Sequence, residues 1–373
     1  MHSLSVDHGA QASLEVGGDT ALDLAVRNLT PLLSRPGLTE LCINGPGEVF
    51  LETGQGWTCQ AVPSLDFDWC WRFAKLVANY TRQRVDESHP LLCGALPSGE
   101  RVQIAMPPAT LQGRVAISIR RPAQTRWSID DLAETGALRD TRAVCVPGDP
   151  IEGELRGLLA TERYAAFLRL AVRSRRNILV SGPTGSGKTT WTKALIAEIP
   201  PDERLITIED APELALDAHP NHVRLFYSKD DQGLSRVTPK QLLEACLRMK
   251  PDRILLAELR SEEAFDYLRN VNSGHPGSIT SVHASSAALA FEQLVLLIKQ
   301  SPGGRGLARR DIRCLLRGLV DVVIQCGLDR HRRSVREIWL RSDSSSRRSL
   351  GPLSGARSRH LPGREAVRAR PQA

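Results

Sequence analysis

Residues 182–189 read Gly-Pro-Thr-Gly-Ser-Gly-Lys-Thr, and this stretch fits the pattern G-x-x-x-x-G-K-[ST] at every position. An apolar segment, Asn-Ile-Leu-Val at 177–180, precedes the glycine loop, and helical spacing follows it from 190 to 199. In this context the glycines let backbone N–H groups curve around a phosphate, and the positive end of the helix faces the same anion. The stretch therefore predicts a nucleotide-binding site in an α/β sheet.

Two side chains of this loop have predicted tasks. The Lys188 ammonium is expected to reach the β- and γ-phosphate oxygens, and the Thr189 hydroxyl is expected to ligate Mg²⁺. The loop therefore predicts ATP and Mg²⁺ as bound groups. The predicted nucleotide-binding residues are Gly182, Pro183, Thr184, Gly185, Ser186, Gly187, Lys188, Thr189 and Thr190.

Strand-like apolar runs alternate with helical segments from about residue 154 onward. The predicted strands lie at 177–180, 205–208, 254–257, 278–282 and 320–326. One helix is predicted to end near Arg173, and further helices are predicted from 190, 238, 262 and 287. Such alternation predicts a mostly parallel sheet with helices on both faces, as in a RecA-like P-loop domain.

The first third of the chain has a different pattern. Two helices are predicted at 20–33 and 66–80, and six short strands are predicted at 41–44, 49–52, 56–60, 91–96, 101–105 and 114–120. This pattern predicts a small α+β domain. The expected boundaries are 1–121 for this N-terminal domain (1–19 frayed), 122–150 for a linker with one short helix after Ser128, 151–341 for the ATPase domain and 342–373 for a disordered Arg-rich tail.

Composition excludes several classes of protein. The chain has 373 residues, of which 41% are hydrophobic, and it lacks both a long apolar run and a signal-peptide pattern. Eight cysteines without a Cys-x-x-Cys pair argue against a zinc site or a disulfide framework and favour a reducing compartment. The net charge is +7, and residues 341–373, with eight Arg and two acidic residues, account for +6 of it. Direct DNA binding is therefore not expected of the nearly neutral folded body.

Carboxylates follow two predicted strands. Glu209 and Asp210 close the strand at 205–208, and ligands of such sheets bind at the carboxyl ends of strands, so Glu209 is a candidate that could help to hold the metal. Glu213, further along the loop, is expected to be structural. Glu258 follows a strand that resembles Walker B, with Ala257 in place of the usual Asp. We expect Glu258 to orient or deprotonate the attacking water, unless it only pairs with Arg260.

Histidines mark the last candidate positions. His283 ends the strand at 278–282 and is expected to sense the γ-phosphate by a hydrogen bond, whereas His275 lies in the preceding loop. His219 and His222 have metal-like spacing without a third ligand, so a packed polar role is favoured for them.

Four segments together resemble the secretion ATPases of type IV secretion and conjugation systems. They are Gly182–Thr190, the acidic box 208–210, Pro-Asp-Arg-Ile-Leu-Leu-Ala-Glu-Leu-Arg at 251–260, and Asn-Ser-Gly-His-Pro-Gly-Ser-Ile-Thr-Ser-Val-His-Ala at 272–284. The resemblance covers about 20–340. Ser261 departs from the Gly usual in this family, and the Arg-rich end beyond 341 matches nothing in it.

The resemblance implies a cytoplasmic motor, peripheral at the inner membrane, that assembles as a homo-hexamer and contacts inner-membrane secretion-system subunits. It further implies that nucleotide lies between the N-terminal and C-terminal domains and that hydrolysis drives their relative motion. Arg101 (Gly-Glu-Arg-Val-Gln-Ile) and Arg120 (Ser-Ile-Arg-Arg-Pro) match the segments whose arginines reach the phosphates. An arginine from another domain would stabilise the developing charge.

Three alternatives stay open. A pilus assembly or retraction ATPase, or a type II secretion ATPase, would use the same chemistry on another cargo. A DNA motor would depend on the basic tail, and its binding would weaken steeply with salt. A nucleotide-gated scaffold without turnover is compatible with Ala257.

Overall fold

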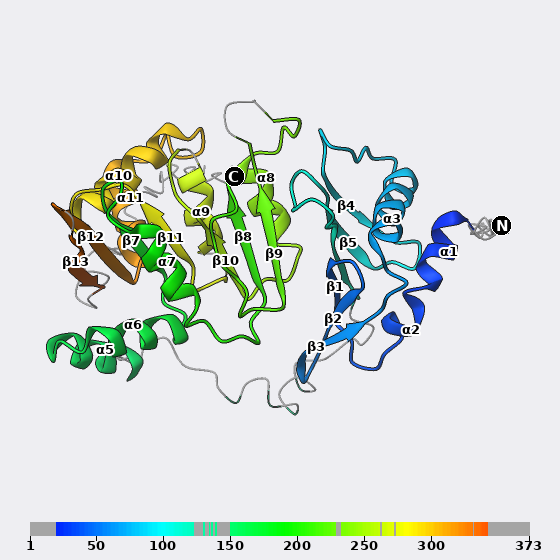
Figure 1. Cartoon of the computed structure of the whole chain (residues 1–373), viewed down its shortest axis with the longest axis horizontal. Coiled ribbons are helices and arrows are strands. Elements are labelled where there is room, and N and C mark those ends of the chain that lie inside the picture. The colour runs from blue at the N-terminus through cyan, green and yellow to red at the C-terminus, as the bar shows by residue number, and fades with distance from the viewer. Residues whose placement is uncertain are drawn as a thin grey trace, which may run out of the picture.

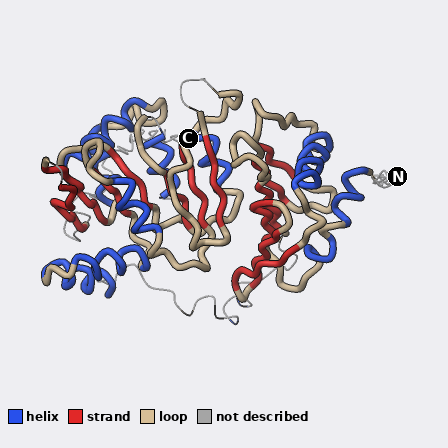
Figure 2. The backbone as a smooth tube through the Cα atoms, viewed as in Figure 1, coloured by secondary structure: helices blue, strands red, loops and turns tan. Residues whose placement is uncertain are grey.

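The structure is a computed structural model. It describes residues 20–122, 150–228, 233–261, 263–271, 274–330 and 332–341, together with the single positions 130, 134, 136 and 139. The predicted linker helix after Ser128, the predicted frayed start and the predicted disordered tail lie outside the described residues. Within them, no helix is both long enough and apolar enough to cross a lipid bilayer. Two groups of strands stand side by side, one in the N-terminal region (residues 20–122) and one in the C-terminal region (residues 150–341) (Figures 1 and 2).

The N-terminal region is one antiparallel sheet with helices on the side away from the C-terminal region (Figure 1). Its strand order is β3-β2-β1-β6-β5-β4. The strands are β1 (Glu40–Gly45), β2 (Glu48–Thr53), β3 (Gly56–Ala61), β4 (Leu91–Ala95), β5 (Arg101–Ala105) and β6 (Ala116–Arg120), and the helices are α1 (Ala21–Arg27), α2 (Thr30–Leu33) and α3 (Phe67–Tyr80). All six predicted strands are thus present.

Local chemistry explains the ends of these helices. Thr20 forms a capping box with Asp23 at the start of α1, and the Asp66 carboxylate accepts the Trp69 N–H at the start of α3. The predicted single helix at 20–33 was wrong, because the chain forms α1 and a separate short helix, α2. Pro31 lies in the first turn of α2, where its missing N–H costs least, whereas it would interrupt a continuous helix.

The C-terminal region holds a three-stranded sheet, β10-β8-β9, and a four-stranded sheet, β11-β7-β12-β13. All pairs are parallel except β12–β13. The strands are β7 (Ile178–Ser181), β8 (Leu205–Glu209), β9 (His222–Phe226), β10 (Arg253–Leu256), β11 (Ile279–Val282), β12 (Val322–Asp329) and β13 (Arg332–Leu340). The helices are α5 (Pro150–Ala160), α6 (Tyr164–Arg173), α7 (Lys188–Ile196), α8 (Pro239–Cys246), α9 (Glu263–Val271), α10 (Ala287–Gln300) and α11 (Arg309–Leu319).

The helix predicted to end near Arg173 is two helices, α5 and α6, and β9, α11 and β13 were not predicted. In β9 buried and half-buried residues alternate, with Val223 and Leu225 facing the core. Helix α11 buries only Ile312 and Leu316, but Ile312, Leu315, Leu316 and Leu319 have helical spacing that could have predicted it. Strand β13 is an edge strand without a fully buried residue and depends on its antiparallel pairing with β12.

Apolar packing continues across the junction of the two regions. Ala105, Ala109 and Ala116 belong to the same buried cluster as Ile206 and Val223 of the C-terminal sheet. The Phe226 N–H donates to the Ala109 carbonyl oxygen at 2.9 Å. The N-terminal sheet is therefore seated against the β8–β9 side, and the glycine loop that follows β7 belongs to the other sheet (Figure 1).

Candidate active site

The glycine loop connects β7 to α7, as predicted. Gly187 is the N-cap of α7 with φ +91°, and Gly185 has φ +77°, a left-handed conformation that non-glycine residues rarely adopt. A Cβ atom on Gly182 would lie 2.8 Å from the Cys326 carbonyl oxygen and 2.5 Å from Ser186 Oγ. The glycines are therefore required by backbone conformation and by close approach to β12.

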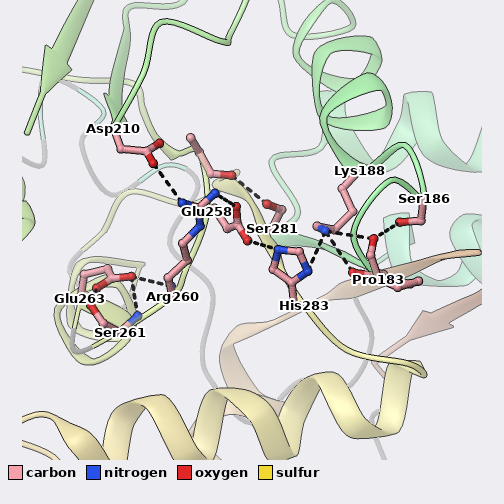
Figure 3. Close-up of polar contacts among 12 residues, drawn as sticks. Pro183, Ser186, Lys188, Asp210, Glu258, Arg260, Ser261, Glu263, Ser281 and His283 are labelled. Atoms are coloured by element: carbon pink, nitrogen blue, oxygen red, sulfur yellow. Dashed lines mark hydrogen bonds and ion pairs between the residues drawn. The ribbon is translucent and has the colours of Figure 1, made fainter. Parts of the chain in front are cut away.

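Lys188 folds back over this loop. Its Nζ donates to the Gly182 carbonyl oxygen at 3.0 Å and to the Pro183 carbonyl oxygen at 3.3 Å, and it lies 3.2 Å from His283 Nδ1 (Figure 3). Burial lowers the pKa of the lysine, and the Glu258 charge opposes that shift. The ammonium is thus placed at the centre of the loop before any phosphate arrives.

Glu258 is held between a histidine and an arginine. His283 Nε2 lies 2.6 Å from Glu258 Oε1, and Arg260 Nη2 donates to Glu258 Oε2 at 2.5 Å (Figure 3). Because the Lys188 ammonium can only donate, His283 Nδ1 is the acceptor, and the tautomer that fits both contacts carries its proton on Nε2. Arg260 also donates to Asp210 Oδ2 at 3.0 Å, and the hydrogen bond to Glu258 raises the pKa of Arg260.

Strand ends bring these side chains together. Glu258 comes just after β10 and His283 just after β11, at carboxyl ends of the two neighbouring sheets next to the glycine loop. The Ser281 hydroxyl donates to the Ala257 carbonyl oxygen at 2.9 Å, and the Leu259 N–H donates to the Ser281 carbonyl oxygen at 2.8 Å. These bonds tie the segment that carries Glu258 to the strand that carries His283.

The loop and these side chains enclose a cavity of about 190 Å³, the phosphate-loop cavity. It is lined by Thr184, Gly185, Lys188, Thr189, Thr192, Asp210, Glu213, Leu214, Ala257, Glu258, Arg260, Ser281 and His283. The described residues contain no cluster of three or more His, Cys, Asp or Glu side chains arranged to hold a metal. The Thr189 hydroxyl and the lining carboxylates are nevertheless oxygen donors of the kind that Mg²⁺ takes alongside phosphate and water.

The structure does not bring Glu209 into this cavity. Glu209 is fully buried and forms a two-point ion pair with Arg224 of β9, at 2.9 and 2.8 Å. Its oxygens also accept the Thr207 hydroxyl and the N–H groups of Glu213 and Leu214. The expectation that Glu209 assists the metal is therefore corrected, because this carboxylate organises the loop that places Asp210 and Glu213 at the cavity.

The other histidines lie elsewhere. His219 is buried, with Nε2 3.0 Å from the Ile199 carbonyl oxygen, and His222 Nδ1 lies 2.6 Å from the His219 carbonyl oxygen. Burial lowers the pKa of His222. Both side chains thus contact backbone carbonyl oxygens in the loops on either side of β8, and His275 lines a different cavity.

Arg101 and Arg120 also line that second cavity, which has a volume of about 240 Å³ and lies where the two regions meet. We call it the junction cavity. It is lined by Glu40, Cys93, Arg101, Val102, Gln103, Arg120, Leu247, Arg248, Lys250, Pro251 and His275. Within one chain these arginines therefore do not line the phosphate-loop cavity.

Two contacts to the site escaped sequence reasoning. Arg333 of β13 donates from Nε to the Gly185 carbonyl oxygen at 3.0 Å, and β13 itself was not predicted. Arg224 was missed because β9 was missed, although the alternation in His-Val-Arg-Leu-Phe at 222–226 could have revealed it. At the turn that departs from the resemblance, Glu263 accepts the N–H groups of Arg260 and Ser261, so serine is accommodated there.

Comparison with known proteins places these features in a family context. The family model described as Type II/IV secretion system protein matches residues 150–326. The chain is 45% identical over 345 residues to the type IV secretion system protein VirB11 of Bartonella henselae, which covers 88% of this chain and 96% of that protein. It is 42% identical over 331 residues to the type IV secretion system protein PtlH of Bordetella pertussis, covering 86% of this chain and 95% of that protein.

A solved structure agrees with these sequence matches. The crystal structure of the VirB11 ATPase from the Brucella suis type IV secretion system, in complex with sulphate, matches with a TM-score of 0.83 and 44% identity. The match covers 88% of this chain and 96% of that chain. The two regions described above are therefore arranged in this chain much as they are in that ATPase.

Proposed function

The chain belongs to the VirB11 family of type IV secretion ATPases, and on that premise we propose that it hydrolyses ATP at the phosphate-loop cavity to power translocation or apparatus assembly in a type IV secretion or conjugative transfer system. One observation carries the proposal. Lys188, His283 and Glu258 form a connected chain of contacts that runs from the glycine loop to the carboxylate beyond β10. A phosphate-binding cation and a candidate base therefore share one cavity.

The proposed chemistry follows from these contacts. The β- and γ-phosphates replace the loop carbonyl oxygens as partners of Lys188, and the backbone N–H groups at the start of α7 bind the same anion. Glu258 orients the attacking water and accepts its proton, while His283 reports the γ-phosphate to Glu258 through its ring. Mg²⁺, which Thr189 would hold, supplies neutralisation of charge on the phosphate oxygens.

The arginine assignment takes a specific form in this proposal. Arg101 and Arg120 line the junction cavity of their own chain, so we infer that they meet the phosphates held by a neighbouring copy. This geometry supports a closed ring of identical subunits, and we propose a homo-hexamer. We also propose that the ATPase domain is RecA-like. The proposed boundaries are 1–121 for the N-terminal domain, 122–150 for the linker, 151–341 for the ATPase domain and 342–373 for the tail.

We further propose that the ring acts in the cytoplasm at the inner membrane, where it contacts inner-membrane subunits of the secretion apparatus. In this proposal the folded body does not bind DNA directly.

A second candidate, a nucleotide-gated scaffold without turnover, is favoured by one observation. In this structure both Glu258 oxygens lie close to basic side chains, Oε2 to Arg260 and Oε1 to His283. Steady-state phosphate release separates the two candidates, because a scaffold binds Mg-ATP but releases no phosphate.

Lys188→Ala tests the leading proposal, with Lys193→Ala as the matched control, since Lys193 lies exposed on the same helix. We expect Lys188→Ala to lose ATP turnover by at least about 100-fold, the scale of one lost charge-stabilising donor, and Lys193→Ala to keep it. The measurement is phosphate release from purified protein. Unchanged turnover in Lys188→Ala would show that the assigned chemistry is wrong.

A further inference from the structure

A row of charged residues crosses the N-terminal sheet next to the junction cavity. Strand register pairs Glu40 of β1 with Glu52 of β2 on one side and with Arg120 of β6 on the other, and it pairs Arg120 with Arg101 of β5. Directly paired residues of an antiparallel sheet project from the same face. The sheet therefore sets two carboxylates beside two guanidinium groups on one face.

Glu40 differs from its neighbour in burial and in partners. Its side chain is 3% exposed, and its Oε2 atom is buried without a hydrogen-bond partner. Glu52, by contrast, receives Lys250 Nζ at 2.7 Å and the Thr39 hydroxyl at 2.9 Å. A buried carboxylate with an unsatisfied oxygen is costly to stability, so Glu40 calls for a reason other than folding.

The contact that Glu40 does make has a useful geometry. Its Oε1 lies 3.6 Å from Nε of Arg120, whose side chain is 64% exposed. Because Glu40 faces Nε, it does not occupy the two terminal nitrogens, Nη1 and Nη2, which form the fork that binds phosphate. Glu40 therefore contacts the guanidinium group on its Nε side, away from the two terminal nitrogens.

We propose that Glu40 is a positioning residue that fixes the Arg120 guanidinium over the junction cavity, with its fork directed at the phosphates of a bound nucleotide. This inference rests on the proposed function, in which Arg120 meets those phosphates. The carboxylate acts on the reaction only through Arg120.

Charge on Glu40 sets how firmly it holds Arg120. Burial raises the pKa of Glu40 to about 7, against opposing effects of Arg120, Lys250 and Arg204, and the Glu52 charge raises it further. Arg101, Arg248 and His275 also line the cavity, and burial lowers the pKa of His275 below its ordinary value. Glu40 is therefore the group of this cavity that gains its charge as the pH rises through about 7.

The test is Glu40→Gln in the full chain, with Glu52→Gln as the control, because Glu52 lies next to Glu40 in the same row but contacts Lys250. We expect Glu40→Gln to lower the kcat for ATP by about 10-fold with less than a twofold change in KM, since a positioned charge acts mainly in the transition state. At pH 8, where Glu40 is charged whether or not the Glu52 charge raises its pKa, we expect Glu52→Gln to keep both constants. Wild-type kcat should rise as the pH passes through about 7, and Glu40→Gln should lose that rise.

Arg120→Ala separates the inference from the function that it rests on. If Arg120→Ala turns over as fast as wild type, the proposed role of Arg120 is wrong and the inference falls with it. If Arg120→Ala is impaired and Glu40→Gln is not, only the inference is overturned.

The double variant completes the cycle. When Arg120 is already absent, Glu40→Gln should reduce kcat by less than about twofold. A full additional loss in the double variant would show that Glu40 acts on the fold rather than through Arg120.

Folding stability gives a readout that is independent of activity. With the pKa near 7 in the folded protein and 4.5 as the ordinary value, the protonated group stabilises the fold at low pH, and this stability is lost as the pH rises through about 7. Glu40→Gln should therefore raise the melting temperature more at pH 8 than at pH 5. An equal change in melting temperature at both pH values would contradict the idea that Glu40 carries a buried charge that positions Arg120.

Discussion

The phosphate-loop cavity and the junction cavity are similar in size, at about 190 and about 240 Å³, and differ in chemistry. The first combines glycine backbone and the basic side chains Lys188, Arg260 and His283 with three carboxylates, Asp210, Glu213 and Glu258. The second is lined by the cations Arg101, Arg120, Arg248 and Lys250, with Glu40 as its carboxylate. In the proposed function the phosphate-loop cavity binds and cleaves the triphosphate, and the junction cavity of a neighbouring copy neutralises the charge that develops during cleavage.

The comparison also shows how differently the two cavities hold their key side chains. Lys188 is tied to two carbonyl oxygens and a histidine, so the phosphate-loop cavity is organised within a single chain. Arg120 has a 3.6 Å contact to Glu40 and is 64% exposed, so the junction cavity presents its cations outward. In the proposed ring, the phosphate-loop cavity of one copy (the preformed half) would meet the arginines that line the junction cavity of its neighbour (the open half).

The largest expected effect tests the preformed half. Glu258→Gln keeps the shape of the side chain but removes the charge that faces Arg260 and His283, together with its ability to accept a proton. We expect kcat for ATP to fall by about 10²–10⁴-fold, the usual contribution of a general base. Nucleotide binding, measured by fluorescence titration with a labelled ATP analogue, should change little.

Glu244→Gln is the matched control, since Glu244 lies exposed on α8 and makes the same change in charge. A Glu258→Gln protein that hydrolyses ATP at the wild-type rate would leave only the ion pair with Arg260 as the role of Glu258.

The next effect tests the open half. The double variant Arg101→Ala/Arg120→Ala should lose turnover by about 100-fold, because charge-stabilising donors are removed while the glycine loop stays intact. Mixing this variant with Lys188→Ala should restore activity if the arginines of one copy serve the loop of its neighbour. Random mixing of equal amounts in a closed ring pairs an intact loop with intact arginines at about one quarter of the sites.

The measurement is phosphate release after subunit exchange, with each variant alone as the reference. A mixture no more active than its components would show that the arginines serve the glycine loop of their own chain. The two cavities would then have to approach each other within one molecule.

Sequence patterns identified the preformed half well. The glycine loop, Glu258 and His283 lie at strand ends, where a period of apolar residues stops and a polar residue follows, and the structure places all three at one cavity. Such positions can be predicted because a parallel sheet brings the carboxyl ends of its strands together whatever the exact strand order.

The open half, and the buried residues that support the site, could not be predicted from the sequence. Glu209 ends its strand just as Glu258 nearly does, yet it is buried because β9 supplies Arg224 from a strand that the sequence analysis missed. The row of Glu52, Glu40, Arg120 and Arg101 depends on strand register across four strands. Register is set by tertiary pairing, so no local pattern within one strand contains it.

A third prediction concerns this buried support. Arg224→Met leaves Glu209, which is fully buried, without its cationic partner, although its hydrogen bonds to Thr207 and the loop remain. We expect the free energy of unfolding to fall by about 3 kcal/mol, the lower end for a broken buried pair. Chemical denaturation measures the loss, and Glu209→Gln in the same chain should recover part of it.

The kinetics of this variant decide the role of Glu209. Below its melting temperature, Arg224→Met should keep ATP turnover within a few-fold of wild type, because Glu209 does not line the cavity. A large loss of turnover without a loss of stability would show that Glu209 contributes to ATP hydrolysis.

The smallest expected effect concerns the contact between the N-terminal and C-terminal regions. Lys250 and Glu52 pair at 2.7 Å across the junction, with side chains 40% and 18% exposed, and partly exposed pairs of this kind are worth about 0–1 kcal/mol. The junction is held instead by the buried cluster that includes Ala105 and Ala109 and by Arg204, which donates to Asn44 at 2.8 Å. Glu52→Gln should therefore shift the denaturation midpoint only slightly, and less so at high salt. A loss above about 2 kcal/mol would mean that this ion pair, rather than apolar contact, holds the N-terminal region against the C-terminal region.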